Sequence, residues 1–344
     1  MTSDEIKLRQ LAGQHLLART DTLTAAENLL GIQAQFMSNV LHSLRLRCGS
    51  TGTVGLVKNW TVRGTIHVFA AADLPLFLSC GEHCREDRWD IPSFWNRRSD
   101  WTLTPRRQEY LSRVILDALA EAPRSREELK VVCRAAGMTE AEESSMFHPW
   151  GGGIRELCER GFIHYAAAEE KIFFLSPAFV PISREKAKLK LARRYFTHLA
   201  PATVHDAQYF FHTTAAQVKK WLAGLPVQSV QCGGNTYFYI ETGMPYVRDI
   251  PRCLFLAGFD QLLLGYEKRE SLYLAPGHVR NIFNLGGIVM PALLLDGRVT
   301  GRWKQKDGRL KLELFSPVSP GDRLVIEEQA HSLWPDLRAI CFDT

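Results

Sequence analysis

The chain of 344 residues is long enough for about two to four domains, and its hydrophobic content of 46% can fill real cores. No stretch approaches the run of about 18 apolar residues that a membrane span needs, and the first residues lack the basic and apolar regions of a signal peptide, so we expect a soluble, cytoplasmic protein without a membrane partner. The net charge of +5 is mild, below what is typical of a dedicated nucleic-acid domain.

The first part of the chain is expected to form three helices and then an extended segment. Apolar positions predict a helix over residues 5–18, and Thr22 or Thr24 caps a second helix from about residue 25 to 32. A third helix follows and ends near Arg47. Residues 60–70 are rich in β-branched and aromatic side chains, which favours a strand. Three helices followed by a strand are typical of a winged-helix unit.

The same order of elements recurs twice without a repeat at the level of residues. The second copy holds three predicted helices and a hairpin, at residues 105–120, 125–136, 143–160 and 162–175, and Gly151-Gly152-Gly153 interrupts the third helix. The third copy holds the same elements, at residues 184–199, 203–211, 215–223 and 228–241. A capping box of Ser125 and Glu128 supports the helix that begins there.

From residue 251 onward the chain changes class. Four short stretches predict strands, at residues 253–256, 288–295, 298–304 and 310–315, with tight turns at Asp296-Gly297 and Asp307-Gly308. We expect them to close into a small antiparallel β-barrel. The sequence therefore predicts an α+β fold with winged helices at 1–104, 105–183 and 184–250 and a β-barrel domain at 251–344.

Two glutamines, Gln33 and Gln35, interrupt an apolar stretch. The residues around them are apolar: Leu29, Leu30, Ile32, Phe36 and Met37. Burying an amide without a hydrogen bond costs about 1–3 kcal/mol. The pair therefore requires a partner, which is either a neighbouring backbone group or a ligand.

Basic residues gather in three patches. One surrounds the aromatic residues between Trp89 and Trp101, one lies on the predicted helix at 184–199, and one lies on the turn from Arg302 to Arg309. Such patches suit phosphate contacts, but solvated helix faces and hairpin tips explain each patch alone about equally well. The three together favour a polyanionic partner.

The eight cysteines indicate neither a metal site nor a disulfide framework. Cys80 and Cys84 have His83 between them, but no second group of ligands stands at the spacing of a zinc site. We therefore expect buried, reduced thiols and no metal or other cofactor.

Several motifs, spread from about residue 25 to 305, carry a family resemblance. They are Gln33-Ala34-Gln35, Val62-Arg63-Gly64-Thr65-Ile66-His67, Pro201-Ala202-Thr203 with Asp206, Gly258-Phe259-Asp260-Gln261-Leu262-Leu263-Leu264-Gly265-Tyr266, Gly277-His278 and Pro291-Ala292-Leu293-Leu294-Leu295-Asp296-Gly297-Arg298-Val299-Thr300-Gly301-Arg302-Trp303. As a set they resemble the AlkZ/YcaQ family of DNA glycosylases, also described as winged-helix DNA-binding domain-containing proteins. The Gln-x-Gln motif by itself would not be specific for this family.

The resemblance implies tandem winged helices with a C-terminal β-barrel, in agreement with the predicted elements. It also implies hydrolysis of the N-glycosidic bond of alkylated purines in double-stranded DNA, including bulky adducts and crosslinks, in repair or self-resistance. Carried over, Gln33 and Gln35 are the catalytic residues that position a water in a DNA-facing cleft. The implied enzyme is a monofunctional glycosylase without a cofactor, and we expect a monomer.

The chemistry favours cationic lesions. An N7-alkylated guanine already carries a positive charge, so its departure needs no protonation, and positioning alone can supply up to about 7–11 kcal/mol of a barrier. An amide can orient water through its carbonyl but cannot act as a general base. Lys58 could form a Schiff base only if its pKa were lowered at the sugar, and nothing in its sequence context requires that.

Further residues are candidates for contacts with DNA. Arg63 and His67 can bind a phosphate, which the sequence favours for Arg63 over capping a helix or pairing with Glu27. For His67, a role as a structural histidine is an equal alternative. The helix after the glutamines offers base-reading side chains, namely Asn39, His42, Arg45 and Arg47. The predicted C-terminal hairpin carries three basic residues, Arg298, Arg302 and Lys304. They can contact a DNA groove, and a solvated hairpin surface explains them nearly as well.

A second class of function stays open, that of a non-catalytic winged-helix DNA-binding protein, either a regulator or a binder of damaged DNA. A regulator needs a helix that reads bases in the major groove. The predicted helix at 143–160 carries Glu143, Glu156 and Glu159 and suits a groove poorly, whereas the helix after the glutamines suits it better. Whether the lesion is a methyl group, a bulky adduct or a crosslink, and whether the base is flipped, also stay open.

Overall fold

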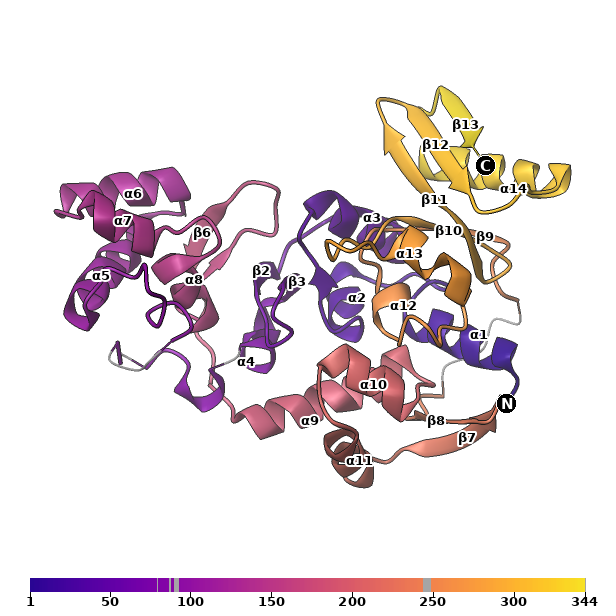
Figure 1. The fold of residues 1–344 in the computed structure, drawn as a ribbon, viewed down its shortest axis with the longest axis horizontal. Helices are drawn as coiled ribbons and strands as arrows, with labels where there is room; N and C mark the ends of the chain where they lie inside the picture. Colours follow the sequence, from indigo (N-terminus) through magenta and orange to yellow (C-terminus); the bar gives the residue numbers. More distant parts are fainter. Residues whose placement is uncertain (79, 87, 90–92, 244–248, 344) are drawn as a thin grey trace. The chain divides into compact units, whose positions relative to one another are not determined.

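The computed structural model describes residues 1–78, 80–86, 88–89, 93–243 and 249–343. Contacts group the chain into two units. Unit 1 comprises Met1–Gln33, Ser38–Gly52 and Ala192–Thr344, and unit 2 comprises Ala34–Met37 and Thr53–Leu191. Both contain helices and strands (Figure 1), so the predicted mixed α+β class is confirmed. The division into four domains stays a prediction.

Unit 2 is built on strands that run in the order β3-β2-β5-β6-β4. They are β2 (Leu56–Trp60), β3 (Ile66–Ala70), β4 (Arg124–Ser125), β5 (Ile163–Tyr165) and β6 (Ile172–Leu175). The hairpin β2-β3 joins the hairpin β5-β6 where Lys58 pairs with Tyr165. Asn59 reinforces this joint, because its Nδ2 donates to the carbonyl oxygens of Cys158 (3.1 Å) and Ile163 (3.4 Å). Segments that the sequence assigned to two separate winged helices thus share one sheet.

The helices of unit 2 are α4 (Leu74–Phe77), α5 (Pro105–Glu121), α6 (Arg126–Ala135), α7 (Glu140–Met146) and α8 (Gly152–Glu159), with short 3₁₀ turns η1 (Ala71–Asp73) and η2 (Gly81–His83). Three of them, α5, α6 and α7, begin at a residue whose side chain caps the helix. The predicted capping box of Ser125 and Glu128 is confirmed at α6. Fully buried side chains of these helices form the core: Leu111, Ile115, Leu129, Ile154 and Leu157.

The predicted helix at 143–160 is interrupted next to its three glycines, as expected. It is divided into α7 and α8, because Gly152 has a φ of +68° and a Cβ there would lie 2.2 Å from the Ser145 carbonyl oxygen. One local expectation in unit 2 is wrong. Cys80 and Cys84 form a disulfide across η2, so reduced thiols are not found at this pair.

Unit 1 combines elements from both ends of the chain. Its helical elements are α1 (Ser3–Gly13), α2 (Thr22–Asn28), α3 (Met37–Cys48), the end of α9 (Arg184–Arg194) with the π-helical turn η3 (Tyr195–Leu199), α10 (Val204–Phe211), α11 (Ala215–Ala223), α12 (Gln261–Leu264), η4 (Pro276–His278), α13 (Val279–Ile282) and α14 (Pro320–Leu333). Its strands are β1 (Ile32–Gln33), β7 (Gln228–Cys232), β8 (Asn235–Tyr239), β9 (Cys253–Leu256), β10 (Ala292–Leu295), β11 (Arg298–Lys306), β12 (Arg309–Leu314) and β13 (Ala339–Asp343). Of the helices formed by the described residues, none is both long and apolar enough to span a bilayer.

The predicted C-terminal β-barrel is wrong. The strands form an open sheet in the order β13-β12-β11-β10-β9, in which β12 and β13 are parallel and the other pairs antiparallel. The physical reason is α14, which the sequence analysis missed. This helix connects β12 to β13 and buries Ile326 and Ala330 against Phe255 and the leucines of the sheet. The apolar face of the sheet is therefore covered by a helix and not by further strands.

A buried ion pair joins the two ends of the chain within unit 1. The guanidinium of Arg47 on α3 donates to both carboxylate oxygens of Asp260, at 3.0 and 2.8 Å, and both side chains are fully buried. The same guanidinium donates to the Gln14 carbonyl oxygen (2.9 Å) and to the Ser43 hydroxyl (2.9 Å). Asp260 also caps α12 by accepting from the Leu262 N–H. Asp260 therefore has a structural role.

Removing one charge of this pair should destabilise the fold strongly. Asp260→Asn keeps the shape and an acceptor for the α12 cap but leaves Arg47 as a buried, unpaired charge, so we expect a loss of about 3–5 kcal/mol in the free energy of unfolding. Urea denaturation at neutral pH measures it. The control is Glu313→Gln, which breaks the partly exposed pair with Arg302 and should change stability by less than about 1 kcal/mol. Equal effects in the two variants would contradict the expectation.

Candidate active site

The chain turns sharply just before the two glutamines. After α2, the backbone enters the left-handed region at Leu30 (φ +55°) and Gly31 (φ +78°), and the Gly31 N–H bonds back to the Ala26 carbonyl oxygen. Leu29, Leu30 and Ile32 are buried. Their burial and this helix-ending turn fix the position of the backbone at Gln33, the last residue of this part of unit 1.

Gln261 holds this turn in place. Its Nε2 donates to the carbonyl oxygens of Leu29 (2.8 Å) and Gly31 (2.6 Å), and its side chain is buried on α12. Because Asp260, the preceding residue, is bonded to Arg47, the buried ion pair also positions Gln261. Sequence reasoning missed this role. The sequence did contain a feature that could have indicated this role, namely an amide next to Asp260 within an apolar run. Gln33 and Gln35 were singled out for the same reason, because they are amides in an apolar stretch.

The two glutamines have different environments. Gln33 is buried at the end of β1, with 8% of its surface exposed, whereas Gln35 is exposed. Neither side-chain amide has a hydrogen bond to another residue in the described part of the chain. The expected need for a partner therefore applies to Gln33, while solvent or a ligand can reach Gln35 directly.

In unit 2, a carboxylate from the β5-β6 hairpin meets the segment just after Gln35. Glu169 accepts a hydrogen bond from the Met37 N–H (3.2 Å) at the start of α3, where a negative charge is favourable. Lys58 on β2 donates to the Ala168 carbonyl oxygen and so holds the tip of the hairpin. Burial lowers the pKa of Lys58, and the nearby Glu169 carboxylate opposes that shift. Sequence reasoning missed Glu169, because it lies 132 positions from Met37.

His67 occupies a structural position. It is fully buried, its Nδ1 lies 3.1 Å from both the Thr65 carbonyl oxygen and the Thr61 hydroxyl, and its Nε2 lies 3.0 Å from Nη1 of Arg63. Burial, with the Arg63 charge, lowers the pKa of His67 well below its usual value. A neutral ring therefore accepts from Arg63 and donates to the backbone. This geometry favours the structural alternative for His67, and Arg63 remains partly exposed.

Only part of the expected base-reading set on α3 reaches the surface. Arg45 is exposed and Asn39 partly so, with its amide packed against Gly258, where a Cβ would lie 2.8 Å from it. His42 and Arg47 are buried. His42 Nε2 bonds to the Phe255 carbonyl oxygen (2.7 Å), and burial lowers the pKa of His42 to about 4. The prediction that His42 and Arg47 read bases is wrong, because both belong to the core of unit 1.

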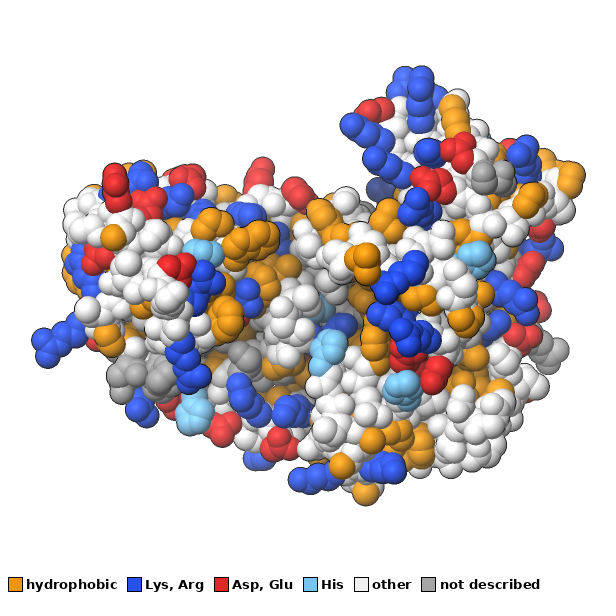
Figure 2. Space-filling view, in the orientation of Figure 1, with side chains coloured by type: hydrophobic (Ala, Val, Ile, Leu, Met, Phe, Trp, Pro, Cys, Tyr) orange, Lys and Arg blue, Asp and Glu red, His pale blue; other side chains and the backbone are white. Residues whose placement is uncertain are grey.

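The predicted basic residues of the C-terminal region lie on β11. Arg298 and Lys304 are exposed, whereas Arg302 is partly buried and paired through Nε with Glu313 (2.6 Å). Figure 2 shows Lys and Arg side chains gathered over the β11-β12 hairpin. A hollow of about 650 Å³ there is lined mainly by basic residues: Lys304, Lys306, Arg309, Lys311 and Arg338, with Asp307 and Ala339. Trp303 packs against the core of unit 1, and its indole N–H donates to the Leu256 carbonyl oxygen.

Comparison with known proteins gives a consistent result. The family model "DNA glycosylase AlkZ-like" matches residues 26–334. The interstrand DNA cross-link repair glycosylase of Streptomyces sahachiroi is 26% identical over 333 residues, which cover 88% of this chain and 87% of that protein. The solved structure of Streptomyces sahachiroi DNA glycosylase AlkZ matches with a TM-score of 0.77 and 21% identity over 99% of each chain, which at this identity demonstrates the fold.

Removing the Gln261 amide should loosen the turn before Gln33. Gln261→Ala leaves the Leu29 and Gly31 carbonyl oxygens without this donor, so we expect a loss of about 1–3 kcal/mol in stability. We also expect faster hydrogen exchange at the Gly31 amide. Mass spectrometry of peptides covering residues 26–36 measures the exchange. Gln329→Ala on α14 is the control and should leave these peptides unchanged; unchanged exchange in Gln261→Ala itself would refute the role.

Proposed function

The chain belongs to the AlkZ-like family of DNA glycosylases, and from this membership we propose that it hydrolyses the N-glycosidic bond of alkylated purines in double-stranded DNA. The observation that carries the proposal is the Gln33-Ala34-Gln35 segment, whose preceding turn is held by Gln261 and whose following residues are held by Glu169. Fixed amides next to a reactive sugar can act by positioning, which is a large source of rate acceleration.

In this mechanism the side-chain carbonyl oxygens of Gln33 and Gln35 accept hydrogen bonds from a water and direct its lone pair at the anomeric carbon. The bond to the base breaks as the sugar acquires oxocarbenium character, and the bonding electrons neutralise the cationic base. Amides do not remove the proton of the water, which passes to bulk solvent once the new C–O bond has formed, so the lesion must supply the driving force through its charge. We therefore infer a preference for N7-alkylated purines over neutral bases.

Bulky or crosslinked lesions are the substrates that we propose. The support is the name of the relative from Streptomyces sahachiroi, an interstrand cross-link repair glycosylase, which shares 26% identity with nearly the whole chain. Repair of such damage, including resistance to a toxin that the producing cell makes itself, would be the biological role. The enzyme would act as a cytoplasmic monomer without a cofactor.

Water rather than an amine is the nucleophile in this proposal. Lys58 has a lowered pKa, which a Schiff-base lysine requires, but its ammonium group is bonded to the Ala168 carbonyl oxygen and holds the β5-β6 hairpin. The proposed enzyme is accordingly monofunctional and leaves an abasic site.

DNA would be bound through the exposed basic and polar residues. We propose winged-helix roles for the repeated groups of helices and hairpins, with contacts from residues that reach the surface: Asn39, Arg45, Arg63, Arg298 and Lys304. Arg302, paired with Glu313, and buried His67 would support this surface. Burial of His42 and Arg47 removes half of the base-reading set on α3, which weighs against the alternative of a sequence-specific regulator.

Base release tests the function. The purified chain should release 7-methylguanine from methylated duplex DNA, or unhook a bulky or crosslinked N7 adduct, and leave abasic sites. Chromatography of the released base and cleavage of the abasic strand by alkali measure the two products. Binding to duplex DNA without release from any of these substrates would instead support a non-catalytic DNA-binding protein.

Substituting both glutamines tests the catalytic assignment. Gln33→Ala with Gln35→Ala should slow single-turnover base release by at least about 100-fold, because the water loses its alignment. Duplex affinity should stay close to that of the unchanged protein. Gln305→Ala on β11 is the matched control. Release at the original rate by the double variant would show that other residues orient the water.

A further inference from the structure

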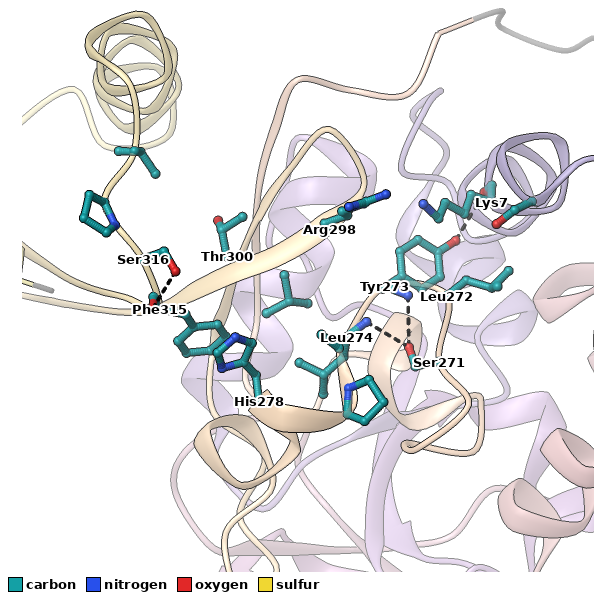
Figure 3. Close-up of a pocket in the computed structure, with 16 residues that line it drawn as sticks. Lys7, Ser271, Leu272, Tyr273, Leu274, His278, Arg298, Thr300, Phe315 and Ser316 are labelled. Atoms are coloured by element: carbon teal, nitrogen blue, oxygen red, sulfur yellow. Dashed lines mark hydrogen bonds between the residues drawn. The ribbon is translucent and has the colours of Figure 1, made fainter. Parts of the chain in front are cut away.

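A cavity of about 490 Å³ within unit 1 is separate from the glutamine pair and has an unusual lining (Figure 3). Its residues come from α1, from the segment 271–278, from β11 and from residues 315–318. Three of them can carry positive charge, Lys7, His278 and Arg298, and several are hydroxyl residues: Ser3, Ser271, Thr300 and Ser316. Among the described residues that line it, there is no aspartate or glutamate.

Lys7 is the first indication of an anionic ligand. Its side chain is only 7% exposed, and its one ion-pair partner in the described part of the chain is Asp4, at 3.5 Å from Nζ. The Asp4 side chain is 74% exposed, so the pair compensates little for burying an ammonium group. The Tyr273 hydroxyl bonds to the Lys7 carbonyl oxygen (3.3 Å) and to Gln10 Oε1 (3.0 Å), which secures α1 against the cavity wall.

Arg298 provides a second positive charge at the same place. It follows the tight turn at Asp296 and Gly297, and a Cβ on Gly297 would lie 3.6 Å from Cδ of Lys7. The Arg298 and Lys7 side chains point toward one another (Figure 3), and within the described ranges the Arg298 guanidinium has no ion pair. Two facing cations repel, and an anion between them would convert the repulsion into two attractions.

The remaining polar groups complete a set of donors. Ser271 Oγ accepts from the backbone N–H groups of Tyr273 (3.2 Å) and Leu274 (3.3 Å), so its hydroxyl hydrogen is directed elsewhere as a donor. His278 stacks on Phe315, with ring centroids 4.3 Å apart, and together they form a flat wall. A guanidinium fork, an ammonium group and a hydroxyl suit the several oxygens of a phosphate.

The geometry points to a phosphate-binding pocket formed by Lys7, Arg298 and Ser271. This inference goes beyond the proposed function, because base hydrolysis does not require such a site. The phosphate could belong to the backbone of DNA or to free phosphate in solution, and the chemistry of recognition is the same.

Inorganic phosphate is the first probe, titrated calorimetrically into the full chain at constant ionic strength. The unchanged protein should bind it, and Arg298→Ala or Lys7→Met should weaken binding at least about tenfold through loss of a charge-assisted bond. Arg280→Ala removes an exposed arginine of α13 that does not line the cavity and should bind phosphate normally. Arg298 is exposed, so its variant decides the result even if Lys7→Met unfolds.

Undamaged duplex DNA is the second probe, titrated over a range of salt concentrations. If the pocket holds a backbone phosphate, both variants should bind the duplex more weakly and show a salt slope smaller by about one, and phosphate should compete with DNA. If it holds free phosphate, Lys7→Met should leave duplex affinity unchanged, and any loss should be confined to Arg298→Ala, which removes a proposed DNA contact. No phosphate binding by the unchanged protein, together with unchanged duplex binding by Lys7→Met, would overturn the inference. Neither probe depends on base release. The result for the phosphate pocket is therefore independent of whether the proposed glycosylase activity is found.

Discussion

The buried ion pair of Arg47 and Asp260 is the constraint on which unit 1 depends. Its partners lie 213 positions apart, and the guanidinium also bonds to the end of the α1 segment at Gln14 and to Ser43 on α3. A buried charge pair tolerates no loss of one partner, so the N-terminal helices and the segment around α12 must remain together. Gln261 follows Asp260 directly and bonds to the turn before Gln33. The ion pair is thus connected to the candidate active site through one residue.

Unit 2 restrains the other side of the same segment by different means. Asn59 joins the two hairpins, Lys58 holds the tip of the β5-β6 hairpin, and Glu169 from that tip accepts from the Met37 N–H. The residues before and after the glutamines therefore have separate anchors. Since an amide can promote hydrolysis only by aiming a water, restraint on its backbone contributes directly to the proposed chemistry.

Local features were predicted well because their causes are local. The capping box at Ser125 and Glu128 and the β7-β8 hairpin involve residues a few positions apart, and both are present. The glutamine pair was conspicuous because amides interrupt an apolar run. The β-barrel was wrong because the helical pattern after Pro320 was missed, and α14 returns the chain so that β13 pairs in parallel. His42 and Arg47 were misassigned for a similar reason. Their polar side chains suggested contacts with DNA bases, but both residues lie in the core.

The sequence by itself determined the mixed fold class, the family and the candidate pair Gln33 and Gln35, because motifs, caps and turns are properties of short segments. Only the tertiary structure decided which polar residues face solvent and which neutralise one another inside. It buried His67 behind Arg63, assigned Gln261 and Glu169 to the glutamine segment, and brought Lys7 to Arg298. The physical reason is that these contacts join residues that are distant along the chain or depend on burial, and folding sets both only when the core forms.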